Sequence, residues 1–279
     1  MSRVKPTNPV VNRSHPLARG LVLAWAYWEG GGESVSDISG HGRDGAPFPT
    51  TPSWAITESG QTSIQSSNGW QTPDDSVWSD HAAYTWYSRF RIPNVTGIKT
   101  WLMKGDYSPR NWSYAFRTNG SAAQLFVTSS TSDLGTNYGT APSGTFVANE
   151  WASIVVVWDG SGSANADRLK LYKDGTEISL TYTGTITSVM ADSGDVLQTA
   201  KWEGHGFPFL GDVADTRIWS RALLPGEIAD LYARPFDLYK PAIGTFERYY
   251  ERVAPPSAGQ PEFKRWGQRT NQPIFGRGF

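Results

Sequence analysis

The sequence predicts an all-β fold, an antiparallel sandwich of two sheets with one short helix. Of its 279 residues only 18% are charged, whereas glycine, tryptophan and tyrosine number 29, 13 and 12, a composition typical of β-rich proteins with many turns. Short apolar segments alternate with polar residues at a period of two. Turn residues separate these segments at the intervals of an antiparallel sandwich, which fixes the predicted fold class.

Seven segments are rich in β-branched and aromatic residues and are expected to be strands: 21–28, 84–92, 100–104, 112–118, 123–129, 151–160 and 169–180. Two tight hairpin turns are marked by Asn119-Gly120 and Asp174-Gly175, since these pairs tolerate the positive φ that such turns require. The second turn should pair Leu171 and Tyr172 with Ile178. The connections 42–82 and 129–149 are predicted to be long loops, which are either functional or covered.

One segment, 225–236, has helical character. Pro225 stands near its start, Ile228 and Leu231 have i, i+3 spacing, and Pro235 ends it. After Phe236 the strand pattern stops. An isolated strand around 245–253 is possible, and beyond Pro255 the sequence predicts extended chain.

Charge is distributed unevenly along the chain. The net charge is −1, but residues 1–14 and residues 237–279 each carry a net +3, which leaves about −7 for residues 15–236. Basic ends therefore flank an acidic middle and favour contacts with an acidic partner surface, the alternative being solvated tails. The acidic middle disfavours nucleic-acid binding. The chain has no cysteine, so no disulfide is possible, and no apolar run predicts a signal peptide or a membrane span.

Three blocks of sequence carry a family resemblance. They are LVLAWAYWEGGGESVSDISGHGRDGA (21–46), WASIVVVWDG with LKLYKDGTEI (151–160 and 169–178), and FLGDVADTRIWSRALLPGEIADLY (209–232). In this order they resemble the laminin-G-like or concanavalin A-like family of jelly-roll sandwiches. The resemblance implies a jelly-roll domain at 15–236, with an N-terminal arm at 1–14 and an extended C-terminal arm at 237–279.

Physical reasons account for the third block. Its apolar positions Phe209, Val213, Ile218 and Trp219 should face the core. Asp215 and Arg217 are placed either for local ion pairing or for hydrogen bonds to a loop. Neither feature requires a function.

The sequence predicts no catalytic site. Sugar hydrolases on such sandwiches need closely spaced carboxylates, and no run of alternating acids occurs. The four histidines fall in turns or at strand edges, and no G-x-S-x-G sequence accompanies them. We therefore expect a protein that is not an enzyme.

Calcium is a further possibility, because members of the family bind it in loops at the edge of the sandwich. The carboxylates that could serve are those of Asp37, Asp106 and Asp212. The interpretation we favour is that these side chains bond turn amides, since no local run gathers several oxygen ligands. No cofactor is therefore expected.

Sugar binding without hydrolysis would use exposed aromatic rings. Five tryptophans lie in predicted loops and are candidate glycan platforms: Trp54, Trp70, Trp78, Trp112 and Trp202. The competing explanation is that they pack loops against the sandwich or against other subunits. The tryptophans in predicted strands, namely Trp86, Trp151, Trp158 and Trp219, are expected in the core.

The layout of one sandwich with basic ends resembles proteins of tailed-bacteriophage virions. It implies a non-enzymatic virion structural protein, a capsid decoration or cement protein made in the host cytoplasm. Its arms would grip the major capsid protein or sister subunits of a homo-oligomer. The C-terminal anchors would be Phe263, Lys264, Arg265, Trp266, Arg269, Ile274, Phe275, Arg277 and Phe279. The alternative is a lectin-like module that binds polysaccharide, for example on a tail fibre.

Overall fold

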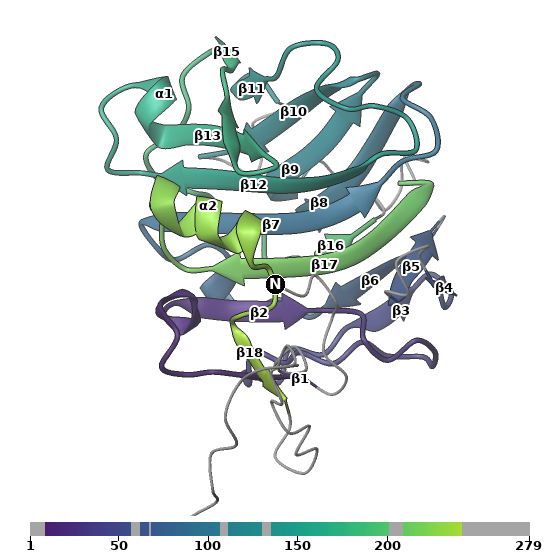
Figure 1. The fold of residues 1–279 in the computed structure, drawn as a ribbon. Coiled ribbons are helices and arrows are strands. Elements are labelled where there is room, and N and C mark those ends of the chain that lie inside the picture. The colour runs from purple at the N-terminus through teal and green to yellow at the C-terminus, as the bar shows by residue number, and fades with distance from the viewer. Residues whose placement is uncertain are drawn as a thin grey trace, which may run out of the picture. The chain divides into compact units, whose positions relative to one another are not determined.

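The computed structural model describes residues 9–56, 62–66, 68–106, 111–129, 135–200 and 209–241 (Figure 1). The chain divides into a large unit, Met1–Ala242, and a second unit, Ile243–Phe279, which lies outside the described residues. The large unit is a sandwich of two antiparallel sheets, so the predicted fold class is confirmed. The possible strand at 245–253 and all of the C-terminal anchors fall in the second unit.

Within the described residues the first sheet has eight strands. Its strands, in spatial order, are β15 (Thr181–Thr183), β11 (Tyr138–Thr140), β10 (Ala122–Val127), β9 (Asn111–Asn119), β8 (Ile98–Asp106), β16 (Leu197–Thr199), β6 (Gly69–Thr72) and β3 (Ala46–Phe48).

Three strands of nine residues each form the centre of the second sheet. In spatial order the strands of this sheet are β14 (Thr176–Ile178), β13 (Leu169–Lys173), β12 (Trp151–Asp159), β7 (Ala83–Arg91), β17 (Gly211–Trp219), β5 (Thr62–Ser66) and β4 (Ser53–Ile56), and β2 (Leu21–Trp25) pairs with the other end of β17. Every pairing in both sheets is antiparallel.

The core between the sheets is aromatic. The ring centroid of Trp86 lies 4.7 Å from that of Tyr114 and 4.9 Å from that of Phe116, which joins β7 of one sheet to β9 of the other. Phe209, Val213 and Ile218 are buried here, as the third sequence block predicted. Aromatic pairs at such separations add to the free energy gained by burial.

A second apolar layer covers the outer face of the second sheet. Helix α2 (Pro225–Ala233) lies across this face (Figure 1), with Ile228 and Leu231 buried against it. Beside it lie the short 3₁₀ helix η1 (Pro16–Ala18) and the paired strands β1 (Pro9–Val11) and β18 (Tyr239–Pro241). Trp219 is buried as predicted, but in this outer layer and not between the sheets.

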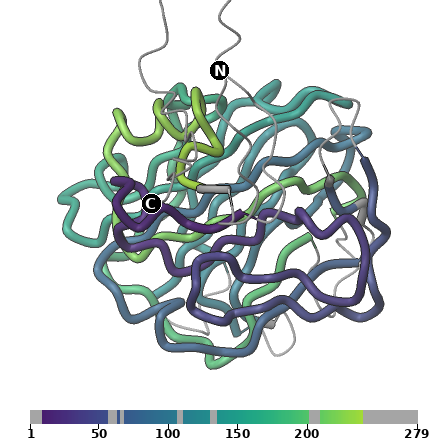
Figure 2. The backbone as a smooth tube through the Cα atoms, turned by 60° about the horizontal axis from the view of Figure 1, so that its bottom comes forward, coloured from purple at the N-terminus to yellow at the C-terminus, as the bar shows by residue number. Residues whose placement is uncertain are grey.

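The pairing of β1 with β18 changes the predicted domain limits. Residues 9–11 and 239–241, which the sequence assigned to the two arms, run side by side as antiparallel strands near the two ends of the described chain (Figure 2). Val11, Leu238 and Tyr239 are buried in the outer layer. The sandwich therefore takes in parts of both predicted arms, while residues 1–8 and 242–279 lie outside the described range.

Both predicted hairpins are present, each with a difference in detail. Asn119 is the last residue of β9 and pairs with Ala122, so the first turn consists of Gly120, with a φ of 63°, and Ser121, and not of Asn119 and Gly120. At the second turn Asp174 and Gly175 have φ values of 52° and 81°. Leu171 is opposite Ile178 as expected, but Tyr172 is opposite Glu177 and not Ile178, because residues along the two strands pair one to one.

The predicted long loops contain short strands. Segment 42–82 holds β3, β4, β5, β6 and the 3₁₀ helix η2 (Ser76–Trp78), and segment 129–149 holds β11. These strands have three to five residues each and a polar, Gly/Pro-rich composition, which hides them from a search for alternating apolar residues. Ile64 of β5 and Trp70 of β6 are nevertheless fully buried in the core. One helical turn, α1 (Asn165–Arg168), also escaped prediction, and α2 ends at Ala233, before the predicted limit of 236.

The predicted ion pair in the third block is present and buried. Arg217 donates to both carboxylate oxygens of Asp215, with its Nε 3.0 Å from Oδ1. Its guanidinium lies over the rings of Tyr87 and Tyr239, at 5.3 and 4.7 Å from their centroids. Since an unpaired buried charge would be strongly destabilising, Arg217 requires the whole of the Asp215 carboxylate.

Candidate functional site

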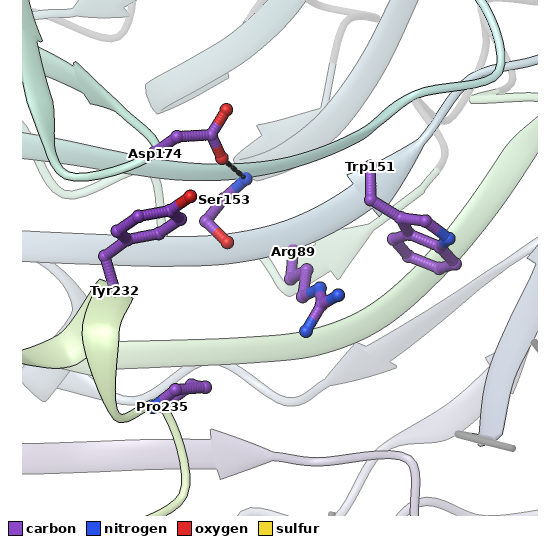
Figure 3. Close-up of a pocket in the computed structure, with 6 residues that line it drawn as sticks. All are labelled: Arg89, Trp151, Ser153, Asp174, Tyr232 and Pro235. Atoms are coloured by element: carbon purple, nitrogen blue, oxygen red, sulfur yellow. Dashed lines mark hydrogen bonds between the residues drawn. The ribbon is translucent and has the colours of Figure 1, made fainter. Parts of the chain in front are cut away.

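A groove on the outer face of the second sheet, beside the end of α2, is the candidate site (Figure 3). Its lining residues come from β7, β12, the β13–β14 turn, α2 and the segment after it: Arg89, Trp151, Ser153, Asp174, Tyr232 and Pro235. Its volume is about 190 Å³. This is below the usual size of drug-sized pockets, so the groove suits one small ring or the end of a longer ligand.

The groove exists because the outer layer stops part of the way along β12. Alternate residues of this strand face the outer layer, where Val155 and Val157 are buried under apolar side chains of α2. Trp151 and Ser153 lie on the same face but are only half-buried. One face of one strand therefore passes from a core into a binding surface.

Two arginines flank the indole of Trp151. Arg89 and Arg91 of β7 pair with Ser153 and Trp151, and both guanidinium carbons lie 5.5 Å from the centroid of the indole. Such cation–π contacts hold the ring in place. Arg91 is neutralised by Asp212, whose Oδ2 lies 2.8 Å away. Among the described residues no carboxylate lies within ion-pair distance of Arg89, whose guanidinium lies between Trp151 and Tyr232 (Figure 3).

The polar wall of the groove is the β13–β14 turn. Asp174 Oδ1 accepts a hydrogen bond of 2.9 Å from the Ser153 backbone N–H, and the Asp174 N–H donates to the Ser153 carbonyl at 2.8 Å. Asp174 Oδ2 lies 3.1 Å from Lys173 Nζ, which offsets the negative charge. These bonds fix the turn against β12, so the carboxylate has a defined position at the edge of the groove.

Tyr232 of α2 closes the other side, with 37% of its surface exposed. Its ring packs on Gly175, where an added Cβ would lie 3.1 Å from Tyr232 Cδ1 and where φ is positive. Only glycine suits this place, because it combines the left-handed turn with the close approach of the ring. The turn and the helix thus position each other.

The ionisation of the outer layer is fixed around neutral pH. Burial raises the pKa of Tyr87, two residues before Arg89 in β7, to about 12, and the positive charges of Arg217 and Arg89 limit the rise. The phenol therefore stays protonated at neutral pH. The groove therefore offers two aromatic rings, a cation, a hydroxyl and a carboxylate, an arrangement for binding. Of the lining residues that the structure describes only Asp174 is acidic, whereas glycoside hydrolysis needs two carboxyl groups.

The expectation that five tryptophans lie exposed in loops is wrong for those the structure describes. Trp54, Trp70 and Trp112 lie in β4, β6 and β9, and Trp78 lies in η2. Trp70 and Trp78 are 0% exposed and Trp112 is 5% exposed, so their rings offer no face to a ligand. Trp70 and Trp78 lie in the core between the sheets, and Trp112 lies in a separate cluster with Met103, Ala115 and Phe126. Packing within the domain, which the competing explanation favoured over ligand contact, therefore accounts for these three rings.

The remaining two loop tryptophans differ. Trp54 is half-buried, donates from Nε1 to the Gly32 carbonyl at 3.0 Å, and lies 5.9 Å from Trp70 between ring centroids. Trp202 falls in 201–208, outside the described residues, and stays a prediction.

Trp151 corrects the reading of the strand tryptophans, because it was expected in the core and lies in the groove. Sequence reasoning also missed Arg89, Ser153 and Tyr232. The sequence held one signal. Ser153 lies on the same face of the strand as Trp151, and a polar residue at that position indicates that this end of the face is not covered by the core. Nothing comparable in the sequence indicates that α2 ends beside it.

Two of the three calcium candidates, Asp37 and Asp212, have protein partners. Both carboxylate oxygens of Asp37 accept backbone N–H groups, from Ala24 and Ser39 and from Arg43, as the favoured interpretation expects. Asp212 pairs with Arg91. Asp106 is the last residue of β8, and its side chain lies outside what the structure describes. Within the described ranges no group of three or more His, Asp or Glu side chains could hold a metal ion.

A buried lysine near the end of β8, a central strand of the first sheet, is surrounded by polar groups. Lys104 of β8 is 0% exposed, and its Nζ lies 2.7 Å from Asp74 Oδ1 and 2.9 Å from Asp192 Oδ1. Ser193 Oγ and the Asp195 carbonyl accept further bonds, at 3.4 and 3.2 Å. The ammonium group thus gathers the segments before η2 and before β16 around one positive charge.

The fold defines a class: a two-sheet antiparallel sandwich, here with a groove on the outer face of one sheet. A family model described as the concanavalin A-like lectin/glucanases superfamily matches residues 64–229, more than half of the chain. The chain belongs to this superfamily, which confirms the predicted resemblance. No curated protein matches the chain. Within the described residues no helix has the length and apolar character to cross a bilayer.

Solved structures with the same fold include three of different kinds. Domain 4 of AbnA, an extracellular arabinanase from Geobacillus stearothermophilus in complex with arabinotriose, is 17% identical, with a TM-score of 0.55 over 76% of this chain and 98% of that one. Trypanosoma rangeli sialidase in complex with sialic acid is 13% identical, with a TM-score of 0.55 over 78% and 33%.

A structure of botulinum neurotoxin type C, from work on its interaction with two ganglioside molecules, is 10% identical, with a TM-score of 0.54 over 77% of this chain and 51% of that one. The chain therefore spans about half of the neurotoxin chain and a third of the sialidase. At these identities the likeness shows the fold. It does not bear on the virion layout, which stays a prediction.

Proposed function

We propose that the chain is a non-enzymatic carbohydrate-binding module and that the groove beside α2 is its ligand site. The observation that carries this proposal is the half-exposed indole of Trp151, which has two guanidinium carbons 5.5 Å from its ring centroid. It lines the same groove as Ser153, which has a hydroxyl, and Asp174, which has a carboxylate. A sugar ring has an apolar C–H face and a rim of hydroxyls. An aromatic platform with a few fixed polar groups complements both.

The comparisons support this function over a role in assembly. The matched structures include an arabinanase domain with bound arabinotriose, a sialidase with bound sialic acid, and a neurotoxin whose cell entry depends on gangliosides. All of these ligands contain sugars, and all of these proteins share the sandwich fold with this chain.

A glycan array followed by calorimetry tests the proposal. The parent chain should bind at least one class of oligosaccharide, and Trp151→Ala and Tyr232→Ala should each weaken binding at least about tenfold, since each removes one wall of the groove. Trp54→Ala is the matched control. Trp54 is also half-buried, but it lies in β4, at the edge of the second sheet and away from β7 and β12, which line the groove. No binding by the parent, or equal loss in the control, contradicts the proposed site.

Assembly into a virion is the second candidate function. It rests on the sequence of residues 254–279, where aromatic and basic residues alternate beyond the sandwich and could contact an acidic surface. The full chain with Trp266→Ala and Phe275→Ala, compared with the parent by analytical ultracentrifugation, tests it. Decoration by these anchors requires self-association or capsid binding that the substitutions reduce, and unchanged behaviour contradicts it.

A further inference from the structure

The charges around the groove are paired with one exception. On the outer face of the second sheet, Arg91 pairs with Asp212 and Arg217 pairs with Asp215. At the turn, Lys173 pairs with Asp174. Arg89 remains, half-buried at the middle of the groove, with no carboxylate within ion-pair distance among the described residues.

Strand pairing explains why Arg89 has no such partner. Its direct neighbour on β17 is Asp215, the residue that an exposed arginine would be expected to bind across the strands. Both oxygens of Asp215 are instead taken by Arg217, which is 0% exposed. An unpaired charge would destabilise the fold more at Arg217 than at Arg89, because Arg217 is fully buried whereas water still reaches Arg89. The fold therefore leaves a guanidinium facing the groove.

We propose that the ligand of this groove is an acidic sugar whose carboxylate binds Arg89. The inference rests on the proposed function, since it names the sugar class for the same site. A guanidinium presents a planar fork of N–H donors that matches the two oxygens of a carboxylate. The sugar ring would then lie against Trp151, whose indole is already held 5.5 Å from the Arg89 guanidinium carbon.

The other charged group limits the class further. Asp174 stands at the far edge of the groove, and its charge is only partly offset by Lys173, because both side chains are partly exposed. A second carboxylate or sulfate on the same sugar would approach Asp174 and be repelled. Sugars with a single carboxylate, of the uronic or sialic acid type, therefore suit the groove better than polyanions.

Paired glycans test the inference by calorimetry at low and moderate salt. The pairs are oligosaccharides that differ only in a terminal uronic acid against its neutral hexose, and sialyllactose against lactose, with sulfated lactose as a third arm. The parent should bind at least one carboxylated member about tenfold more tightly than its neutral partner. Arg89→Gln should bring the ratio of the two affinities to about one, and this ratio is the readout because Arg89 also contacts the indole of Trp151 on which both partners would lie. Arg89→Lys should restore part of the preference.

The control is Arg234→Gln, which removes the same charge from the solvent side of the same region, where Arg234 pairs with exposed Asp230. It should keep the preference of the parent. Equal binding of acidic and neutral partners, or a preference that Arg89→Gln does not alter, overturns the inference and leaves the proposed function standing. Preference for the sulfated sugar alone also overturns it. No binding to any glycan overturns both.

Discussion

Replacing Lys104 by methionine should destabilise the sandwich more than any other single change to its ion pairs outside the Arg217 pair. Methionine keeps the length and apolar stem of lysine but removes the ammonium group. Asp74 and Asp192 would then face each other without the charge that holds them, 2.7 and 2.9 Å from Nζ in the parent. Two segments that the lysine ties to β8 would lose their common partner.

The magnitude follows from the burial of the three groups. Removing one partner of a buried ion pair costs about 3–5 kcal/mol. Lys104 itself is fully buried, but the side chains of Asp74 and Asp192 are 38% and 52% exposed, so water can solvate the carboxylates again. The expected loss is therefore at the lower end, about 3 kcal/mol. For a domain of this size that corresponds to a decrease in Tm of about 6–12 °C.

Thermal and urea unfolding, followed by tryptophan fluorescence, measure the effect. Arg234→Met is the matched control, since its partner Asp230 is exposed, and its Tm should not change measurably. A Tm for Lys104→Met within about 1 °C of the parent would refute the reasoning, because it would mean that the buried ammonium contributes no net stability.

The pH dependence gives a second readout for the same substitution. Burial works against ionisation of Asp192, but the hydrogen bonds from Lys104 and from the Gly194 N–H outweigh it, so its pKa lies below the ordinary value of 3.8. A carboxyl group whose pKa is depressed by folding stabilises the protein above its unfolded pKa, and this contribution is lost as pH falls. The parent should lose stability below pH 3.8, and Lys104→Met should lose less over that range.

Three further predictions concern other parts of the sandwich. Gly105→Ala should lower stability by more than about 1 kcal/mol by urea unfolding, because its φ is 128° and an added Cβ would lie 2.3 Å from the Asn111 carbonyl oxygen. Trp70→Ala should cost about 3–5 kcal/mol yet leave glycan affinity of the folded protein unchanged, as calorimetry would show. Hydrogen bonds from Arg221 hold the pKa of Glu227 below 4.5, so Glu227→Gln should reduce the loss of stability on acidification below that pH.

The strands that form the centre of the sandwich could be predicted from the sequence because their burial leaves a periodic record. The segments 84–92, 112–118 and 151–160 became β7, β9 and β12 with ends shifted by one residue. Strands at the margins, such as β4 and β11, bury few side chains and leave no such record. Trp202 and the C-terminal anchors lie outside the described residues, so what the sequence predicts for them stays a prediction.

The candidate site was harder to predict because exposure is not a property of residue type. Trp70 and Trp151 have the same side chain, yet Trp70 is enclosed between the sheets and Trp151 lies beyond the end of α2. A polar and glycine-rich neighbourhood made Trp70 look exposed, and an apolar strand made Trp151 look buried. Each prediction failed because coverage by distant parts of the chain, not local composition, decides solvent access.

By itself the sequence determined the fold class and the positions of the central strands, which depend on periodic burial, and the Asp174-Gly175 turn, which depends on residues local in the chain. The family followed from the resemblance of three sequence blocks, and the Asp215–Arg217 ion pair was one of two arrangements that the sequence allowed. Tertiary structure alone decided which charges remain unpaired. Asp215 of β17 lies opposite Arg89, but its carboxylate forms an ion pair with the buried Arg217. Arg89 is therefore left facing the groove. Competition between two arginines for one acid depends on their relative burial, which exists only after the sheets and the outer layer have packed.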